Sequence, residues 1–185
     1  MTIVLVTGPA RSGKSEWAEL RATQLASAKA RQVVYVATAQ TNAQDAEWQA
    51  RIERHQYRRP ADWQVIEVPV QLAQAVTQYD QTHCLLIDSL GTWLANLIEQ
   101  DAGEWQIVQE NFIVALTSTA ADVVVVAEET GWGVVPAYAL GRLFRDRLGS
   151  LSRAVGAIAN DVYLVTSGYA INLSSLGEPV DRPEP

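Results

Sequence analysis

The 185-residue sequence has a single cysteine, Cys84, which excludes a disulfide framework and a zinc site built on paired cysteines. Basic residues are scarce as well: 14 Lys and Arg stand against 21 Asp and Glu, a formal net charge of −7. This charge argues against nonspecific binding of nucleic acid, which depends on neutralising phosphates. No apolar run approaches the roughly 20 residues that a membrane-spanning helix needs. Because 48% of the residues are hydrophobic, we expect a folded, cytoplasmic protein without a membrane span.

Short β-branched runs alternate with longer helical stretches along the chain. The expected strands cover residues 3–6, 33–37, 84–87, 123–127 and 162–165, with a weaker candidate over 63–68. The expected helices cover residues 15–28, 44–55, 90–98, 106–117 and 138–159, the last with Gly149 as a candidate kink. Strands that are apolar on both faces suit a parallel sheet covered by helices on each side. The pattern predicts one domain over residues 1–176 and a loose tail over 177–185.

The strongest motif lies between the first expected strand and the first expected helix. It fits G-x-x-x-x-G-K-[ST] and reads Gly8-Pro9-Ala10-Arg11-Ser12-Gly13-Lys14-Ser15. In such a loop backbone N–H groups surround a β-phosphate, the Lys14 ammonium reaches the β- and γ-phosphates, and the Ser15 hydroxyl binds Mg²⁺. The alternative is a chance match in a turn, which the strand-loop-helix context disfavours. The motif therefore predicts nucleotide binding and an α/β, P-loop NTPase-type three-layer fold, with a mostly parallel central sheet flanked by helices.

A second Mg²⁺ ligand is expected among the carboxylates that end other buried strands. Asp88 ends the run Cys84-Leu-Leu-Ile-Asp and is the favoured candidate, while Glu128 and Glu129 after the run over 123–127 are its rivals. Asp88 also precedes an expected helix, so capping of that helix is the alternative interpretation of its carboxylate. A phosphate loop with one carboxylate does not by itself name a reaction.

The two histidines have different surroundings. His83 precedes an expected strand and is interpreted as an ordinary loop residue. His55 belongs to a cluster of five cationic or potentially cationic side chains within nine residues, formed with Arg51, Arg54, Arg58 and Arg59. Such a cluster can hold a triphosphate, and a neutral imidazole can attack phosphorus. A solvated helix end stabilised by the helix dipole explains the same residues, and on chemistry alone it is the favoured explanation.

The ordered motifs resemble those of the bifunctional adenosylcobinamide kinase / adenosylcobinamide-phosphate guanylyltransferase family of cobalamin biosynthesis. The likeness covers nearly the whole chain. It rests on the phosphate loop, Tyr35-Val36-Ala37-Thr38-Ala39, Arg51-Ile52-x-x-His55, Arg59-Pro60-x-x-Trp63, Glu67, Leu86-Ile87-Asp88-Ser89-Leu90, Trp93-Leu94-x-Asn96-Leu97, residues 129–136, residues 142–147 and Val165-Thr166-Ser167-Gly168. Many nucleotide-binding proteins share the first motif, whereas its combination with the His55 segment and the loop over 129–136 is specific.

The resemblance implies two reactions. A nucleoside triphosphate, ATP or GTP, phosphorylates adenosylcobinamide, and GTP then guanylylates His55, from which the GMP passes to the cobinamide phosphate. The implied catalytic residues are His55 and Lys14. Carried over by position, the implied nucleotide contacts are the loop Gly8 to Ser15, Ala37, Thr38, Ala39, Gln56, Tyr57, Arg58, Arg59, Glu67 and Asp88. Mg²⁺ would accompany the nucleotide on Ser15 and Asp88, and the family's assemblies imply a homotrimer.

Two further interpretations stay open at this point. A P-loop small-molecule kinase that lacks the guanylyl step would share the phosphate loop and Asp88 but form no protein–GMP adduct. A nucleotide-dependent regulatory protein would show no dependence on cobinamide. Trp132, between two glycines, is a candidate for stacking on a base, a corrin or a neighbouring subunit, with simple packing as the alternative.

Overall fold

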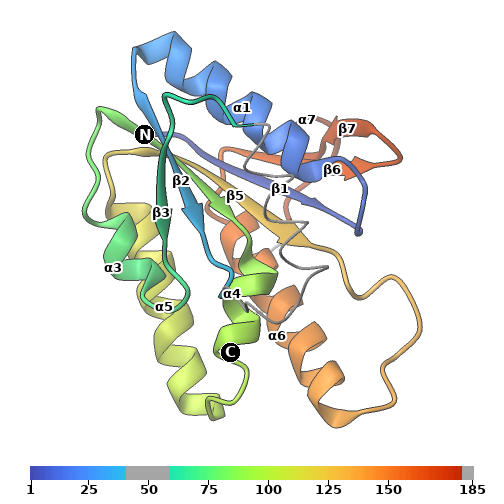
Figure 1. The fold of residues 1–185 in the computed structure, drawn as a ribbon. Coiled ribbons are helices and arrows are strands. Elements are labelled where there is room, and N and C mark those ends of the chain that lie inside the picture. The colour runs from blue at the N-terminus through green and yellow to red at the C-terminus, as the bar shows by residue number, and fades with distance from the viewer. Residues whose placement is uncertain (41–58, 181–185) are drawn as a thin grey trace.

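The structure, a computed structural model, describes residues 1–40 and 59–180 (Figure 1). Its strands are β1 (Ile3–Gly8), β2 (Gln32–Ala37), β3 (Gln64–Glu67), β4 (His83–Asp88), β5 (Asp122–Glu128), β6 (Asp161–Thr166) and β7 (Tyr169–Asn172). Within the described residues they form one sheet in the order β3-β2-β4-β5-β1-β6-β7. Neighbouring strands pair in parallel, except that β6 and β7 are antiparallel.

Helices cover both faces of this sheet. Their bounds are α1 (Lys14–Lys29), α3 (Leu72–Val76), α4 (Leu90–Asn96), α5 (Ala102–Ser118), α6 (Ala139–Gly156) and α7 (Leu173–Leu176). α1 lies on one face and α3, α4, α5 and α6 lie on the other (Figure 1). On the α1 side, Ala18 and Ala22 pack against Val4 and Val6, and small alanines let the helix approach the strands closely. The expected mostly parallel, three-layered α/β fold is confirmed.

Successive residues of β1 face opposite layers, as the period of a strand requires. Ile3 and Leu5 belong to the core beneath α4, α5 and α6, where Trp93 and Phe112 lie with ring centroids 5.0 Å apart. All residues of β1 are buried, which explains why the run is apolar without alternation.

The expected elements agree with the structure except at boundaries and in short pieces. The weak candidate over 63–68 forms β3. α5 begins at Ala102, four residues before its expected start, because Asp101 and Glu104 form a capping box there. α6 is one continuous helix that includes Gly149, the candidate position for a kink. α3, β7 and α7 were not expected, and the helix expected over 44–55 lies outside the described residues. No described helix has the length and apolar character needed to cross a membrane.

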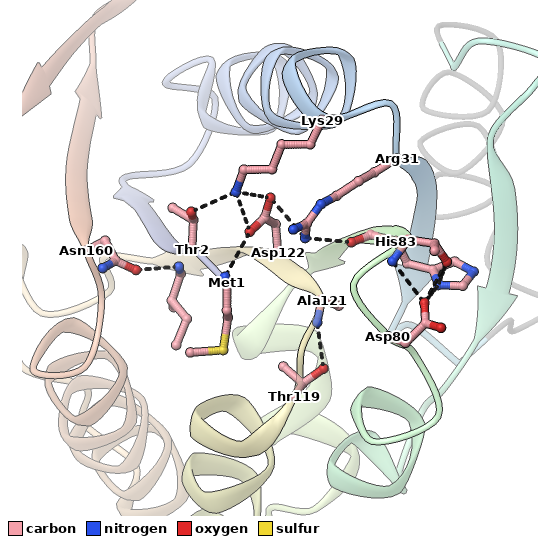
Figure 2. A network of polar contacts seen from close by, with 12 residues as sticks. Met1, Thr2, Lys29, Arg31, Asp80, His83, Thr119, Ala121, Asp122 and Asn160 are labelled. Carbon is pink, nitrogen blue, oxygen red and sulfur yellow. Dashed lines mark hydrogen bonds and ion pairs between the residues drawn. The ribbon is translucent and has the colours of Figure 1, made fainter.

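An ion cluster around one buried carboxylate lies at the amino edge of the sheet, where the parallel strands begin (Figure 2). The Asp122 side chain is fully buried at the start of β5. Lys29 Nζ lies 2.8 Å and Arg31 Nη1 lies 3.1 Å from its Oδ2, and the Met1 ammonium lies 4.0 Å from its Oδ1. The cluster joins the end of α1, the approach to β2 and the start of β5. His83 is at the same edge, with its Nδ1 2.9 Å from the Asp80 carboxylate. It is the first residue of β4, paired with Gln32, and not the loop residue that the sequence predicts.

Candidate functional site

The phosphate loop connects β1 to α1 at the carboxyl edge of the sheet. Gly8 ends β1 and lies so close to β6 that a Cβ atom there would overlap the Val165 carbonyl oxygen. Gly13 has a φ of 96°, a left-handed conformation that favours glycine, and it is the N-cap of α1. Gly168 N donates a hydrogen bond to Ser12 O at 3.2 Å, which ties the loop to the turn after β6. The two glycines of the motif therefore stand where the backbone requires them.

Two polar groups of this loop indicate a place for phosphate. The Lys14 side chain is buried, and its Nζ donates to Pro9 O at 3.3 Å across its own loop. Ser12 Oγ is buried and has no hydrogen-bond partner in the described parts of the chain. Since a buried hydroxyl without a partner is costly, the Ser12 group fits a loop that completes its bonds with a phosphate. Ser15 stands in the first turn of α1, next to Lys14, as a Mg²⁺ ligand of the nucleotide would require.

Asp88 ends β4 at the same edge. Its Oδ2 accepts a hydrogen bond from the Tyr35 hydroxyl at 2.8 Å. The N-cap of α4 is Ser89, whose side chain accepts a bond from Thr92 N, so the alternative interpretation of Asp88 as a helix cap is wrong. Asp88 therefore keeps its place as the favoured carboxylate for the metal of a bound nucleotide.

The rival carboxylates are held by protein donors. Glu128 ends β5, which lies between β1 and β4. Its Oε1 accepts from Ser89 Oγ, and its Oε2 accepts from Gly91 N at 2.8 Å. A Cβ atom at Gly91 would overlap this carboxylate. Burial raises the pKa of Glu128, opposed by the bond from Ser89 and by the charge of Lys14.

Glu129 anchors the next loop to the phosphate loop. Its Oε1 accepts from Thr7 Oγ1 at 2.7 Å, and its backbone N donates to Gly8 O at 3.0 Å. Beyond this anchor the segment to α6 exposes several large apolar side chains. They are Trp132 (61% exposed), Val134 (94%), Val135 (60%) and Tyr138 (84%).

The end of β2 is joined to the start of α4 by Thr38. Thr38 is fully buried; its Oγ1 donates to Ser89 O at 2.8 Å and accepts from Ser89 N at 2.9 Å. Asn96 Nδ2 donates to Thr38 O at 2.8 Å. The segment Ala37 to Ala39 thus lies beside Asp88, with the Thr38 side chain committed to the protein.

Glu67 lies further along the same edge, at the end of β3 and in register with Ala37. It is exposed and lines an open pocket of about 500 Å³ between β3 and α3. Arg59 lies over the Tyr35 ring, with its Cζ 3.4 Å from the ring centroid. His55, Gln56, Tyr57 and Arg58 lie outside the described residues, so their expected contacts stay predictions.

Comparisons with known proteins identify the family. A family model described as "Cobinamide kinase / cobinamide phosphate guanyltransferase" matches residues 4–173. The chain belongs to this family. It is 36% identical over 178 residues to the bifunctional adenosylcobalamin biosynthesis protein CobP of Pseudomonas aeruginosa, which covers 95% of this chain and 98% of that protein. It is 34% identical over 186 residues to the bifunctional adenosylcobalamin biosynthesis protein CobU of Escherichia coli, with 92% and 99% covered.

Among solved structures, the flagellar accessory protein FlaH of Methanocaldococcus jannaschii matches with a TM-score of 0.49 and 12% identity, over 92% of this chain and 75% of that one. The matches to CobP and CobU cover 98% and 99% of those proteins. The sequence-based assignment to this enzyme family is therefore confirmed.

In this cobinamide kinase / guanyltransferase, Ser89 and Tyr35 were not expected as site residues, although both lie in motifs that resemble those of the family. Ser89 was visible as the first residue after Asp88, with Thr92 three residues on, a spacing that suits a helix cap. The signal for Tyr35 is weaker: it carries a polar hydroxyl in a strand whose other buried residues are aliphatic. Its position beside Asp88 depends on β2 pairing with β4, which the sequence does not state.

Proposed function

We propose that this chain catalyses both reactions of its family. In the first, a nucleoside triphosphate phosphorylates the hydroxyl of adenosylcobinamide. In the second, GMP from GTP passes through His55 to the cobinamide phosphate, which yields adenosyl-GDP-cobinamide. The observation that carries the proposal is the family match over residues 4–173, together with a phosphate loop that has Lys14 buried beneath it.

The kinase step relies on the loop. Its backbone N–H groups and the Lys14 ammonium stabilise the charge that develops on the phosphates as the γ-phosphorus passes from the β–γ bridging oxygen to the substrate oxygen. The nucleoside diphosphate leaves with the electrons of the broken P–O bond, and the substrate hydroxyl gives its proton to solvent. The residues that would hold Mg²⁺ are Ser15 and Asp88, and the ion would supply further positive charge to the phosphates. Lys14, Ser15 and Asp88 all occupy the carboxyl edge, where ligands bind in open parallel sheets.

The guanylyl step consists of two displacements at the α-phosphorus. A nitrogen of neutral His55 attacks, a P–N bond forms, and pyrophosphate leaves with the electrons of the broken P–O bond. An oxygen of the cobinamide phosphate then attacks the same phosphorus, and the P–N bond breaks to free the imidazole. In the sequence His55 lies among Arg51, Arg54, Arg58 and Arg59, whose positive charge would stabilise charge on the phosphate oxygens.

Intact mass after incubation with GTP tests the second step. The wild type should gain the mass of one GMP, and acid should remove it because a phosphoramidate is acid-labile. His55→Ala should gain none, whereas His83→Ala, which changes the histidine bonded to Asp80 at the opposite edge, should gain the same adduct as the wild type. An adduct on the His55 variant equal to that of the wild type would exclude His55.

The same variants separate the two activities. Transfer of ³²P from γ-labelled ATP or GTP to adenosylcobinamide should survive in His55→Ala, because that step needs no histidine adduct. A wild type that phosphorylates cobinamide but never forms the GMP adduct would instead support the single-activity kinase.

We propose further that the protein is a homotrimer and is located in the cytoplasm, where GTP and ATP are present. The exposed apolar residues Trp132, Val134, Val135 and Tyr138 support association through the segment before α6. Sedimentation of the wild type against Trp132→Ser with Val134→Ser tests it: we expect a trimer for the first and smaller species for the second.

A further inference from the structure

Tyr35 contacts two residues assigned to the nucleotide site. It lies in β2 between β3 and β4, and only 3% of its surface is exposed. Its hydroxyl donates to Asp88 Oδ2 at 2.8 Å. The Arg59 guanidinium lies over its ring, with Cζ 3.4 Å from the centroid. A phenylalanine would fill the same space in the core, so packing alone does not account for the hydroxyl.

The hydroxyl is a dependable donor. The Tyr35 phenol carries the hydrogen of this bond, because both side-chain oxygens of an ionised carboxylate can only accept. Its hydrogen bond to Asp88 then has a charged acceptor, which makes it stronger than a bond between neutral groups and restricts rotation of the carboxylate.

The ring and the hydroxyl join segments that are distant in sequence. Asp88 is 53 residues after Tyr35 and belongs to the phosphate-loop half of the site. Arg59 is four residues after His55 and belongs to the segment assigned to guanylyl transfer. An arginine stacked on an aromatic face keeps its N–H groups at the edge of its plane free to bind phosphate oxygens.

We propose that Tyr35 is a positioning residue of the nucleotide site, whose hydroxyl orients the Asp88 carboxylate and whose ring seats the Arg59 guanidinium. One side chain then fixes, relative to each other, a group of the phosphoryl-transfer half and a group of the guanylyl-transfer half. The assignment of the halves rests on the proposed function, whereas the positioning of two nucleotide contacts does not.

The hydroxyl is tested by a double-mutant cycle on nucleotide affinity. The full chain is titrated with N-methylanthraniloyl-GTP and Mg²⁺, without cobinamide, for Tyr35→Phe, Asp88→Asn and the double variant. Tyr35→Phe should weaken binding about tenfold, as expected for a hydrogen bond to a charged group. Asp88→Asn should itself bind the labelled GTP more weakly than the wild type. When Asp88→Asn is already present, adding Tyr35→Phe should weaken binding by less than a further twofold.

The control is Tyr163→Phe on β6, whose ring also lies beneath an arginine, with Arg21 Cζ 5.3 Å from its centroid. It should bind like the wild type. An equal loss from Tyr35→Phe in both Asp88 backgrounds would mean a general effect on structure and would overturn the first half of the proposal. Unchanged binding by Tyr35→Phe would overturn it as well.

The ring is tested by comparing Tyr35→Leu with Tyr35→Phe in two backgrounds. With Arg59 present, Leu should bind the labelled GTP about fivefold more weakly than Phe; with Arg59→Ala, the two should bind equally. Because Leu can disturb the core, Arg59→Lys and Arg59→Gln give a second measurement. Lys, which keeps a cation over the ring, should retain more affinity than Gln. The ring does not position Arg59 if the difference in affinity between Leu and Phe at position 35 is the same with and without Arg59, and if Arg59→Lys and Arg59→Gln lose the same affinity.

These outcomes are independent of turnover. If the wild type forms no GMP adduct and phosphorylates no cobinamide, the proposed function fails while the binding cycles still decide the role of Tyr35. If both activities are present and the cycles are additive, the proposed function stands and the positioning role fails.

Discussion

The two edges of the parallel sheet hold their carboxylates in opposite ways. At the amino edge, fully buried Asp122 is surrounded by Lys29, Arg31 and the Met1 ammonium (Figure 2). At the carboxyl edge, Asp88 accepts a hydrogen bond from Tyr35, and Glu128 accepts bonds from Ser89 and Gly91 while the charge of Lys14 favours its ionised form. The first arrangement neutralises a charge within the protein and serves the fold. The second places carboxylates beside a phosphate loop, which suits a site completed by a metal–nucleotide complex.

The largest expected effect comes from removing the lysine of the carboxyl edge. Lys14→Ala should lower kcat/KM of cobinamide phosphorylation about 10³-fold, because a buried cation aimed at the phosphates is lost. Transfer of ³²P from γ-labelled nucleotide measures it. Lys29→Ala changes a lysine at the other end of the same helix and should leave this activity nearly intact. Equal losses from the two variants would remove the functional distinction between the edges.

Asp122→Asn should act on the fold instead. Removing the buried charge leaves Lys29 and Arg31 without their shared partner, and we expect a loss of about 3 kcal/mol in the free energy of unfolding. Urea denaturation measures the loss, and nucleotide affinity of the folded protein should stay unchanged. Asp146→Asn, which removes an exposed carboxylate on α6, should shift stability by no more than about 0.5 kcal/mol.

Two glycine substitutions compare a position at the start of α4, where a Cβ atom would overlap a carboxylate, with a position in the interior of α6, where a Cβ atom has space. Gly91→Ala should destabilise the protein by about 2 kcal/mol, because its Cβ would displace the Glu128 carboxylate from Gly91 N. Gly149→Ala in α6 meets no atom within 4 Å and should stabilise by about 0.5–1 kcal/mol. Thermal unfolding ranks the two; a stable Gly91 variant would show that Glu128 can move freely.

The smallest effect is a pH dependence from Glu128. Burial raises its pKa in the folded state, so the folded protein binds the proton more tightly than the unfolded chain does. Stability contributed by this group is therefore present near and below the unfolded pKa, ordinarily 4.5, and is lost as pH rises above it. The stability of Glu128→Gln relative to the wild type should increase as pH rises above 4.5. A flat difference would contradict a raised pKa.

The sequence predicted those parts of the fold and site that local backbone rules control. The phosphate loop was predictable because its turn requires glycine at fixed places, of which Gly13 is the clearest example. The family was recognised from motifs along the chain, and the comparisons confirm it. α5 begins four residues before its expected start because the Asp101–Glu104 capping box, and not the apolar pattern, sets its first turn.

The remaining features depend on which strands become neighbours. Tyr35 reaches Asp88 only because β2 pairs with β4, and Glu128 lies beside the start of α4 because β5 is the next strand. The short elements α3, β7 and α7 have too few residues for a periodic pattern. The roles of His55, Lys14 and the metal ligands Ser15 and Asp88 stay predictions for the experiments above.

The strand order also sets how each half of the nucleotide site is protected from fraying. Among the described strands, β1, which ends in the phosphate loop, is fifth of seven and has β6 and β7 outside it. In the same set of strands, β2, which carries Tyr35, has only the four-residue β3 outside it. Amide hydrogens of β1 should therefore exchange with solvent more slowly than those of β2. The phosphate loop therefore follows a strand in the interior of the described sheet, whereas Tyr35, whose ring contacts Arg59, belongs to a strand near its edge.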